Sequence, residues 1–339
     1  MSLVMREEGS AVSESVFSRE FAQSTSHEDL YHWFRLVLGR RPNPGEWEEH
    51  VRNLQGKPVD QVAAIYLNSL EFANRLGHLR ATLLSGVSKI EFDGIRLHTR
   101  DADLEVGGQL RDRGSYEPHV TEVFKSHLKA GMSVIDIGAN IGYFTMLAAS
   151  LVGKSGQVIA FEPNSDNVKL LELSRRDNDF ANVHVLQSAA GRETGLLVLN
   201  TSVTNGTTSQ LSDDSLSLLD STIVQCLKVD DFVRGDQTID LIKVDVEGAE
   251  YNALLGAERT ILRCKPLITS EFTPGMLPGI SGVTGEEFLS YVVSLRYEIS
   301  VLEEAGGVTM CGRDVARVLG NYAESHRSHI DLLFTPIGN

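Results

Sequence analysis

An apolar segment that runs into a glycine turn and then into a helix is the first candidate for ligand-binding chemistry. Residues 134–145 read Val-Ile-Asp-Ile-Gly-Ala-Asn-Ile-Gly-Tyr-Phe-Thr. A strand–turn–helix of this kind presents backbone N–H groups at the carboxyl edge of a sheet, where open α/β folds bind ligands. We expect Gly138 to let a bulky ligand approach the main chain and Gly142 to allow close packing at the helix start.

Two classes of cofactor compete for this turn. A dinucleotide site uses G-x-G-x-x-G, so that the pyrophosphate can sit on the helix N-terminus. Here Asn140 replaces the middle glycine, and Tyr143 and Phe144 crowd the helix entry. S-adenosylmethionine instead presents a sulfonium and an amino acid: Asp136 attracts the cationic groups, and Asn140 can hydrogen-bond the amino-acid end. The turn therefore favours S-adenosylmethionine, with a purely structural turn as the alternative.

Two further strand ends suit the rest of that cofactor. Glu162 follows an apolar strand in Phe161–Asn164, where doubly wound nucleotide folds place an acid that accepts hydrogen bonds from ribose hydroxyls. Asn164 lies near the cap of the next helix. After a third strand, Ser188 and Ala189 are small enough for an adenine ring to lie against the backbone, although an ordinary tight turn has the same composition.

Three acids crowd the exit of a fourth strand: Asp245, Glu247 and Glu250. Three carboxylates so close together repel one another unless they are solvated, protonated or neutralised by a sulfonium, by Lys243 or by a metal. We expect Asp245 and Glu247 to be functional and Glu250 to be an exposed helix residue. Glu271, which ends a fifth strand, joins the same edge.

Methyl transfer to an alcohol requires removal of the hydroxyl proton as the new bond forms. We assign that role, or the orientation of the acceptor, to Glu247, with Asp245 holding the cofactor or acceptor. Glu271 and Glu117 are weaker candidates. A divalent metal on Asp245, Glu247 and Glu271 is an alternative that no ligand spacing demands, so no metal is assigned. His119 and His127 are expected to be surface or packing residues.

The elements that must position these residues alternate between strand and helix. Buried strands that alternate with helices predict an α/β fold with a doubly wound parallel sheet. The predicted strands are 133–137, 157–161, 183–187, 239–244 and 267–271, and the predicted helices are 141–151, 164–178 and 248–262.

Further strands are expected outside this alternation. The runs 195–200 and 223–229 form a pair around a polar loop, 202–221, and two more strands are expected at 297–301 and 330–334. Asp93-Gly94 between alternating runs predicts a β-hairpin, because a type I′ turn needs positive φ at both central residues.

The N-terminal quarter has a different pattern. Residues 1–26 are expected to be a flexible arm, and residues 27–84 a small helical domain with apolar side chains at three- and four-residue steps, such as Leu30, Phe34 and Leu38. The methyltransferase-type domain is expected over residues 85–339.

Composition limits the partners. The 339 residues carry 31 basic and 46 acidic side chains, a net charge of −15. This charge argues against nucleic-acid and anionic-membrane partners. Three cysteines without a C-x-x-C pair, an acidic N-terminus and strand-sized apolar runs indicate a reduced, cytoplasmic protein with no signal peptide or membrane span. A homodimer is compatible with the sequence.

Together these motifs resemble the FkbM family of methyltransferases. The matching segments are Tyr116–Pro118, Val134–Tyr143, Ala160–Asn164, Ala189-Ala190, Asp240–Glu250 and Asp331–Phe334. The resemblance covers roughly residues 88–336. It implies an S-adenosylmethionine-dependent O-methyltransferase that acts on a hydroxyl of a sugar, glycan or polyketide natural product.

The resemblance also implies a set of cofactor-binding residues. They are Glu117, Asp136, Gly138, Asn140, Glu162 and Asp245, to which the same motifs add Gly142, Tyr143, Asn164, Ser188 and Ala189. Residues 31–75 are similar to an uncharacterised helical family, through Leu38-Gly39-Arg40, Pro42 and Ser69–Phe72.

Three rival functions stay open at this point. The first is a nicotinamide-dependent oxidoreductase, against which the missing central glycine argues. The second is a non-catalytic cofactor-binding protein with the helical domain as its interaction module, and the third is methylation of nitrogen. An acceptor pocket is expected from residues 111–118, 201–220 and 272–284.

Overall fold

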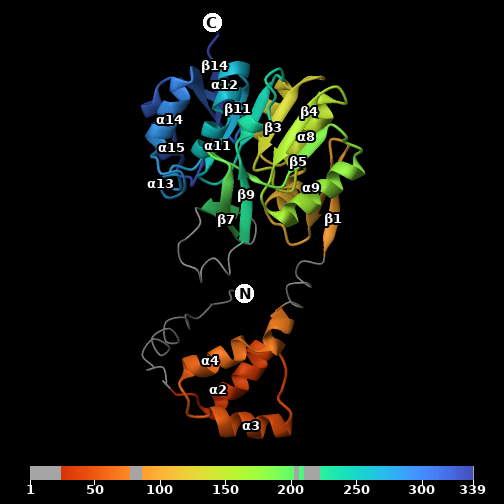
Figure 1. The fold of residues 1–339 in the computed structure, drawn as a ribbon, viewed down its shortest axis with the longest axis vertical. Helices are drawn as coiled ribbons and strands as arrows, with labels where there is room; N and C mark the ends of the chain where they lie inside the picture. The colour runs from red at the N-terminus through yellow and green to blue at the C-terminus, as the bar shows by residue number, and fades with distance from the viewer. Residues whose placement is uncertain (1–23, 77–85, 202–205, 210–221, 339) are drawn as a thin grey trace, which may run out of the picture. The chain divides into compact units, whose positions relative to one another are not determined.

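The computed structural model describes residues 24–76, 86–201, 206–209 and 222–338. The chain divides into two compact units, Met1–Ser85 and Gly86–Asn339 (Figure 1). The expected arm over residues 1–26 and the polar loop 202–221 lie mostly outside the described residues.

The larger unit is built on an eight-stranded sheet in the order β13-β12-β14-β11-β10-β3-β4-β5. The parallel strands are β3 (Ser133–Ile137), β4 (Gln157–Phe161), β5 (Val183–Leu186), β10 (Leu241–Val244) and β11 (Leu267–Phe272). An antiparallel edge follows, made of β14 (Ile330–Pro336), β12 (Tyr297–Leu302) and β13 (Val308–Gly312). The predicted α/β fold with a doubly wound parallel sheet is confirmed.

Alternation along the strands gives the sheet two apolar faces. Val134 and Leu241 belong to one buried cluster and Ile135 and Ile242 to the other, because successive side chains of a strand point to opposite faces. The first cluster includes residues of α6 (Val106–Arg113), α7 (Pro118–His127), α8 (Tyr143–Val152) and α9 (Ser165–Asp177). The second includes residues of α11 (Glu250–Gly256), α12 (Glu258–Cys264), α13 (Leu277–Ile280), α14 (Gly285–Ser294) and α15 (Val315–Ser325).

The predicted hairpin is present as β1 (Val87–Phe92) and β2 (Ile95–Arg100). Asp93 and Gly94 both have positive φ, 47° and 74°, as a type I′ turn requires. A second, four-stranded sheet joins β6 (Ala189–Ala190), β9 (Thr222–Leu227), β7 (Gly195–Thr201) and β8 (Gly206–Ser209). The predicted strand pair is therefore β7–β9, and Ala189 lies in a short strand instead of a loop.

Two predictions for the larger unit were incomplete. The single helix predicted over 248–262 is two helices, α11 and α12, separated at Ala257. The strand β13 and the helices α6, α14 and α15 were missed; β13 is a short edge strand that leaves its apolar residues Val308 and Met310 exposed. Among the described residues, no helix is both long and apolar enough to cross a membrane.

The smaller unit has its own core. Its helices are α2 (His27–His32), the π-helix η1 (Trp33–Leu38), α3 (Pro44–Leu54) and α4 (Val59–Leu67), and they enclose Leu30, Phe34, Leu38, Leu54, Val62 and Tyr66. Arg40 pairs with both Glu46 and Glu71, and the Ser69 hydroxyl accepts a hydrogen bond from the Phe72 N–H. The motif residues of this unit thus hold its helices together.

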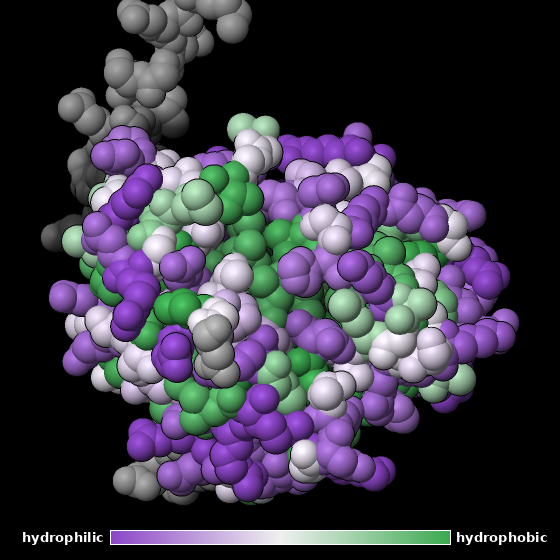
Figure 2. Space-filling model, turned by 90° about the horizontal axis from the view of Figure 1, so that it is seen from above, coloured by the Kyte–Doolittle hydropathy of each residue, from purple (hydrophilic) through white to green (hydrophobic). Residues whose placement is uncertain are grey.

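On the face in Figure 2 most side chains are hydrophilic, and the apolar ones gather toward the middle.

Candidate active site

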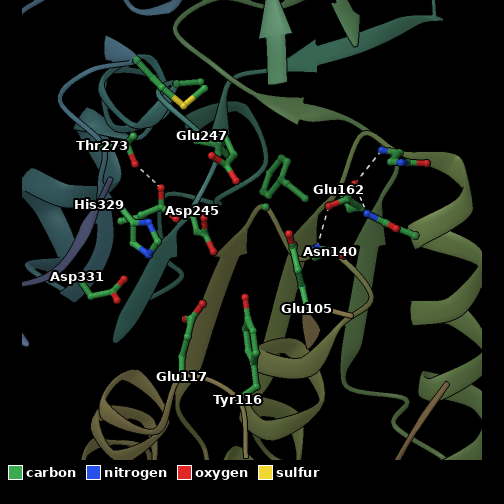
Figure 3. A pocket seen from close by; sticks show the side chains of 18 of the residues that line it. Glu105, Tyr116, Glu117, Asn140, Glu162, Asp245, Glu247, Thr273, His329 and Asp331 are labelled. Carbon is green, nitrogen blue, oxygen red and sulfur yellow. Dashed lines mark hydrogen bonds between the residues drawn. The ribbon is translucent and has the colours of Figure 1, made fainter. Parts of the chain in front are cut away.

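A cavity of about 600 Å³ lies where the parallel strands end. The segments that follow β3, β4, β10 and β11 line it, together with the start of α7 and the start of β14. Figure 3 shows Glu117 and Asp245 on one side of this cavity and Asn140 and Glu162 on the other. Eight of the residues predicted for the site line the cavity: Glu117, Gly138, Asn140, Glu162, Asn164, Ala189, Asp245 and Glu247.

Glu162 joins the ends of two strands. Its Oε2 accepts a hydrogen bond of 2.8 Å from the N–H of Asn140, and its Oε1 accepts one of 2.9 Å from the N–H of Asn164. Burial raises the pKa of Glu162 to about 7, which these backbone hydrogen bonds partly oppose. Oε1 also accepts a hydrogen bond of 3.4 Å from Nδ2 of Asn167. A carboxylate accepts about four hydrogen bonds, so capacity remains for a hydroxyl group of a ligand.

Gly138 and Gly142 are each required in the turn for a different steric reason. A Cβ on Gly138, whose φ is +79°, would lie 1.8 Å from the carbonyl oxygen of Asp245. The neighbouring strand end therefore excludes a side chain at Gly138, and Gly138 also lines the cavity, so its expected role toward a ligand stays a prediction. A Cβ on Gly142 would lie 2.8 Å from Leu171 Cγ, which agrees with the expected close packing.

A buried lysine compensates the acids at the centre of the sheet. Lys243 is 4% exposed, its Nζ lies 2.9 Å from Asp245 Oδ2, and it stands 5.0 Å from the ring centroid of Phe144. Burial would lower the pKa of Lys243, but Asp245, Asp136 and Glu117 outweigh burial and raise it. Lys243 therefore stays charged, and its charge compensates the carboxylate of Asp245 at the exit of β10.

Asp136, Gly142, Tyr143 and Ser188 do not line the cavity. Asp136 is fully buried and accepts a 2.5 Å hydrogen bond from Thr145 Oγ1. Tyr143 stacks on Phe92, and its hydroxyl lies 3.1 Å from Thr121 Oγ1. Asp136 thus contacts α8, and Tyr143 contacts the hairpin and α7, instead of lining the cavity.

The carboxylates that line the cavity include Glu117, Asp245, Glu247, Glu271 and Asp331. In Figure 3, Glu117, Asp245, Glu247 and Asp331 lie on the side of the cavity opposite Glu162, which we call the acidic end. Burial, then Asp245 and Asp331, raise the pKa of Glu117 to about 8. Burial and Asp245 raise the pKa of Glu271 to about 10, although the hydroxyl of Thr273 donates to its Oε1. Both side chains therefore hold protons at neutral pH in the absence of a cationic ligand.

Glu250 is a correction. It was expected to be an exposed helix residue, but it is only 1% exposed. Its Oε1 accepts hydrogen bonds from the N–H groups of Val246 and Gly248, at 3.1 and 3.0 Å. Glu250 thus fixes the loop that carries Asp245 and Glu247.

Two histidines, His119 and His329, also line the cavity at the acidic end. His119 was expected at the surface or in packing; it is 9% exposed, and its Nε2 lies 2.6 Å from Asp331 Oδ2. His329, which no sequence argument singled out, lines the cavity beside Asp331 (Figure 3). His119 follows the motif residues Glu117-Pro118, and that proximity was the one available signal for it.

Three residues of the site have left-handed backbones without being glycine. Glu117, Asn140 and Glu247 have φ of 39°, 51° and 52°. Such conformations are unfavourable and persist where the surrounding structure imposes them, often at functional sites. These backbone conformations direct the side chains of Glu117, Asn140 and Glu247 into the cavity.

Comparison with known protein families shows which class of enzyme has a site of this kind. The model of the methyltransferase FkbM domain matches residues 136–299. These residues therefore form an FkbM methyltransferase domain. The FkbM domain contains the turn, Glu162, Asp245 and Glu247, and it is the domain of an S-adenosylmethionine-dependent methyltransferase.

Solved structures similar to this chain include three methyltransferases. An FkbM methyltransferase from Methylobacillus flagellatus is 17% identical, with a TM-score of 0.38; the match covers 63% of this chain and 50% of that one. A SAM-dependent O-methyltransferase from Thermotoga maritima is 13% identical, with a TM-score of 0.37 and coverage of 74% and 78%. An rRNA methylase from Streptococcus thermophilus is 12% identical, with a TM-score of 0.38 and coverage of 65% and 95%.

The comparisons give two further results. This chain spans half the length of the Methylobacillus flagellatus protein. No protein of curated function matches it.

The residues of the FkbM domain fit S-adenosylmethionine chemically. Glu162 retains acceptor capacity for a ribose hydroxyl, and Ala189 and Ala190 offer small side chains to a flat ring. The acidic end suits a sulfonium and an ammonium, since both are cations. Within the described ranges, no group of three or more side chains is placed to hold a metal ion.

Proposed function

We propose that the protein transfers a methyl group from S-adenosylmethionine to a hydroxyl of a sugar, glycan or natural product. The observation that carries this proposal is the position of Asp245 and Glu247, which leave the central strand β10 and line the cavity beside Glu117 and Glu271. We place the cofactor between Glu162 and Asp245 and the acceptor over the acidic end.

The bound cofactor supplies an activated methyl group, and the chain supplies positions and a proton acceptor. Aligned reactants contribute about 7–11 kcal/mol relative to the free bimolecular reaction. Asp245, held by Lys243 at 2.9 Å, favours the cationic donor. Glu247 orients the acceptor hydroxyl and takes its proton as the oxygen–carbon bond forms.

An ionised Glu247 is required for that step. Burial and the nearby Asp245 raise the pKa of Glu247, and His329 lowers it. A raised pKa makes a carboxylate a stronger base, which suits general-base catalysis when it lies near the working pH. Asp245 and His329 thus set the basicity of Glu247 in opposite directions.

A direct test is an acceptor screen. Purified full-length protein is incubated with S-adenosylmethionine and panels of monosaccharides, oligosaccharides, polyketide alcohols and matched amines, and release of S-adenosylhomocysteine is recorded. Mass spectrometry and NMR of each product then locate the methyl group. O-methylated products are expected; methylation found only on nitrogen would contradict the proposal.

A further inference from the structure

A second cavity, of about 290 Å³, adjoins the catalytic one. Its walls come from the last turns of α15, the loop that leads into β14 and the end of β12. Glu304, His329 and Asp331 line both cavities. These three shared residues make the second cavity a side groove of the active site.

The side groove has an apolar floor and a polar rim. Leu302 and Ile330 in its floor are only 4% and 5% exposed. The rim offers the pair of Arg327 with Glu304, whose Nη1 and Oε1 are 2.6 Å apart, and the side chains of Asn321 and Ser325. The Asn321 amide and the Ser325 hydroxyl donate to carbonyl oxygens of α15 at 2.7 Å, so these two residues offer mainly their side-chain oxygens as acceptors. Amide, hydroxyl, carboxylate and guanidinium groups are the partners that sugar hydroxyls use in hydrogen bonding.

The net negative charge of the groove favours neutral polar ligands over anionic ones. Four carboxylates line it, from Glu303, Glu304, Glu324 and Asp331, against the single guanidinium of Arg327. A phosphate or carboxylate on the ligand would meet net repulsion there. An uncharged segment rich in hydroxyls meets no such repulsion and can use both the donors and the acceptors of the rim.

We propose that the side groove binds a second sugar ring of an acceptor longer than one ring. The ring that is methylated lies in the catalytic cavity, its hydroxyl near Glu247, and the chain continues past His329 and Asp331 into the groove. This inference rests on the proposed function and deepens it, since it states how far the acceptor extends and that this extension is uncharged.

The test compares acceptors of different length with variants that fill the groove. Ser325→Tyr and Glu324→Tyr each place a ring in the groove. Ala323→Tyr, on the same helix but outside the groove lining, is the matched control. For each protein, kcat/KM is measured with a monosaccharide acceptor and with its di- and trisaccharide. Saturation-transfer NMR with S-adenosylhomocysteine present measures trisaccharide binding without turnover.

Wild type is expected to prefer the longer acceptors. Either groove variant should lower kcat/KM for them about tenfold, the size of one or two lost hydrogen bonds, and weaken the NMR signal of the distal ring. The monosaccharide value should change less than twofold, and Ala323→Tyr should match wild type. Equal kcat/KM for all lengths in wild type, or equal losses for short and long acceptors in the variants, would overturn the proposal.

The outcome can be separated from that of the proposed function. The atom that receives the methyl group tests O-methylation, whereas the dependence on acceptor length tests the groove. A trisaccharide phosphorylated on its distal ring is expected to be a poorer acceptor than the neutral one, and a better one would also overturn the assignment.

Discussion

Lys243 Nζ lies 2.9 Å from Asp245 Oδ2 inside the sheet, with only 5% of the lysine side chain exposed. Breaking a buried ion pair by removing one partner leaves an uncompensated charge and costs about 3–5 kcal/mol. We expect Lys243→Met to lower the free energy of unfolding by that amount, measured by urea denaturation. Lys154→Met, at an exposed position, should stay within about 0.5 kcal/mol of wild type; equal stability of the two variants would contradict the role of Lys243.

A comparison of Gly138 with Gly153 separates the effect of steric contact from that of backbone strain. Both have positive φ, +79° and +63°, but a Cβ meets the Asp245 carbonyl oxygen at 1.8 Å only at Gly138, with nothing within 4 Å at Gly153. Gly153→Ala should cost about 1 kcal/mol through backbone strain. Gly138→Ala should cost more and reduce S-adenosylhomocysteine affinity in calorimetry, because the two strand ends must separate. Similar losses in both variants would show that steric contact is not the reason for Gly138.

Glu247→Gln tests the proton acceptor. The substitution keeps the size of the side chain and removes its basicity, so kcat should fall about 10²–10⁴-fold while the Kd for S-adenosylhomocysteine stays within threefold. Glu298→Gln, at an exposed position on β12, serves as the control. Turnover that survives in Glu247→Gln would remove this residue from the mechanism.

His329 should influence the pH profile through Glu247. His329 lowers the pKa of Glu247, against burial and Asp245, which raise it. His329→Ala therefore raises that pKa, and the acidic limb of kcat/KM, which reports the ionisation of the base, should move to higher pH. His326→Ala, on an exposed histidine outside the cavity lining, should leave the limb in place; an unmoved limb in both variants would contradict the coupling.

The buried acids predict how stability depends on pH without ligand. Burial is the main cause that raises the pKa values, to about 7 for Glu162 and Glu250, about 8 for Glu117 and about 10 for Glu271. A raised carboxyl pKa stabilises the fold fully below the unfolded value, 4.5, and that contribution is lost as the pH rises through the folded value. The free energy of unfolding should therefore fall as the pH rises from about 5 to 9.

Glu271→Gln provides the check on that pH dependence. It keeps a neutral side chain at the most perturbed position, so denaturation curves at several pH values should show a weaker decline on the alkaline side. Glu286→Gln, exposed on α14, should decline like wild type. A stability that rises with pH would show that these acids are ionised and compensated in the folded protein.

The sequence predicted the parallel part of the sheet closely because its strands are continuous apolar runs. β3 and β4 have the predicted boundaries, and Glu162, Asp245 and Glu247 were placed from their positions directly after strands. Carboxyl ends of parallel strands meet at one edge, so strand order in the chain is enough to bring such residues together.

Residues that depend on long-range contacts could not be read in the same way. His119 and Asp331 are 212 positions apart and meet only because β14 inserts beside β11. Glu250 looked like one of many helical acids, since its burial arises from the tight loop that its own carboxylate holds. His329 lies in the loop before β14, just outside the matching segment Asp331–Phe334, so no motif included it.

The antiparallel edge of the sheet has a consequence for changing the acceptor of this enzyme. We expect cofactor contacts from the loops after β3 and β4, whose backbones are tied to each other through Glu162, whereas the side groove is built by α15 and the segments around β12 and β14. If the proposed function holds, substitutions confined to this distal part should change which acceptors react and leave the methyl-donor site untouched, so directed evolution of substrate range should begin there.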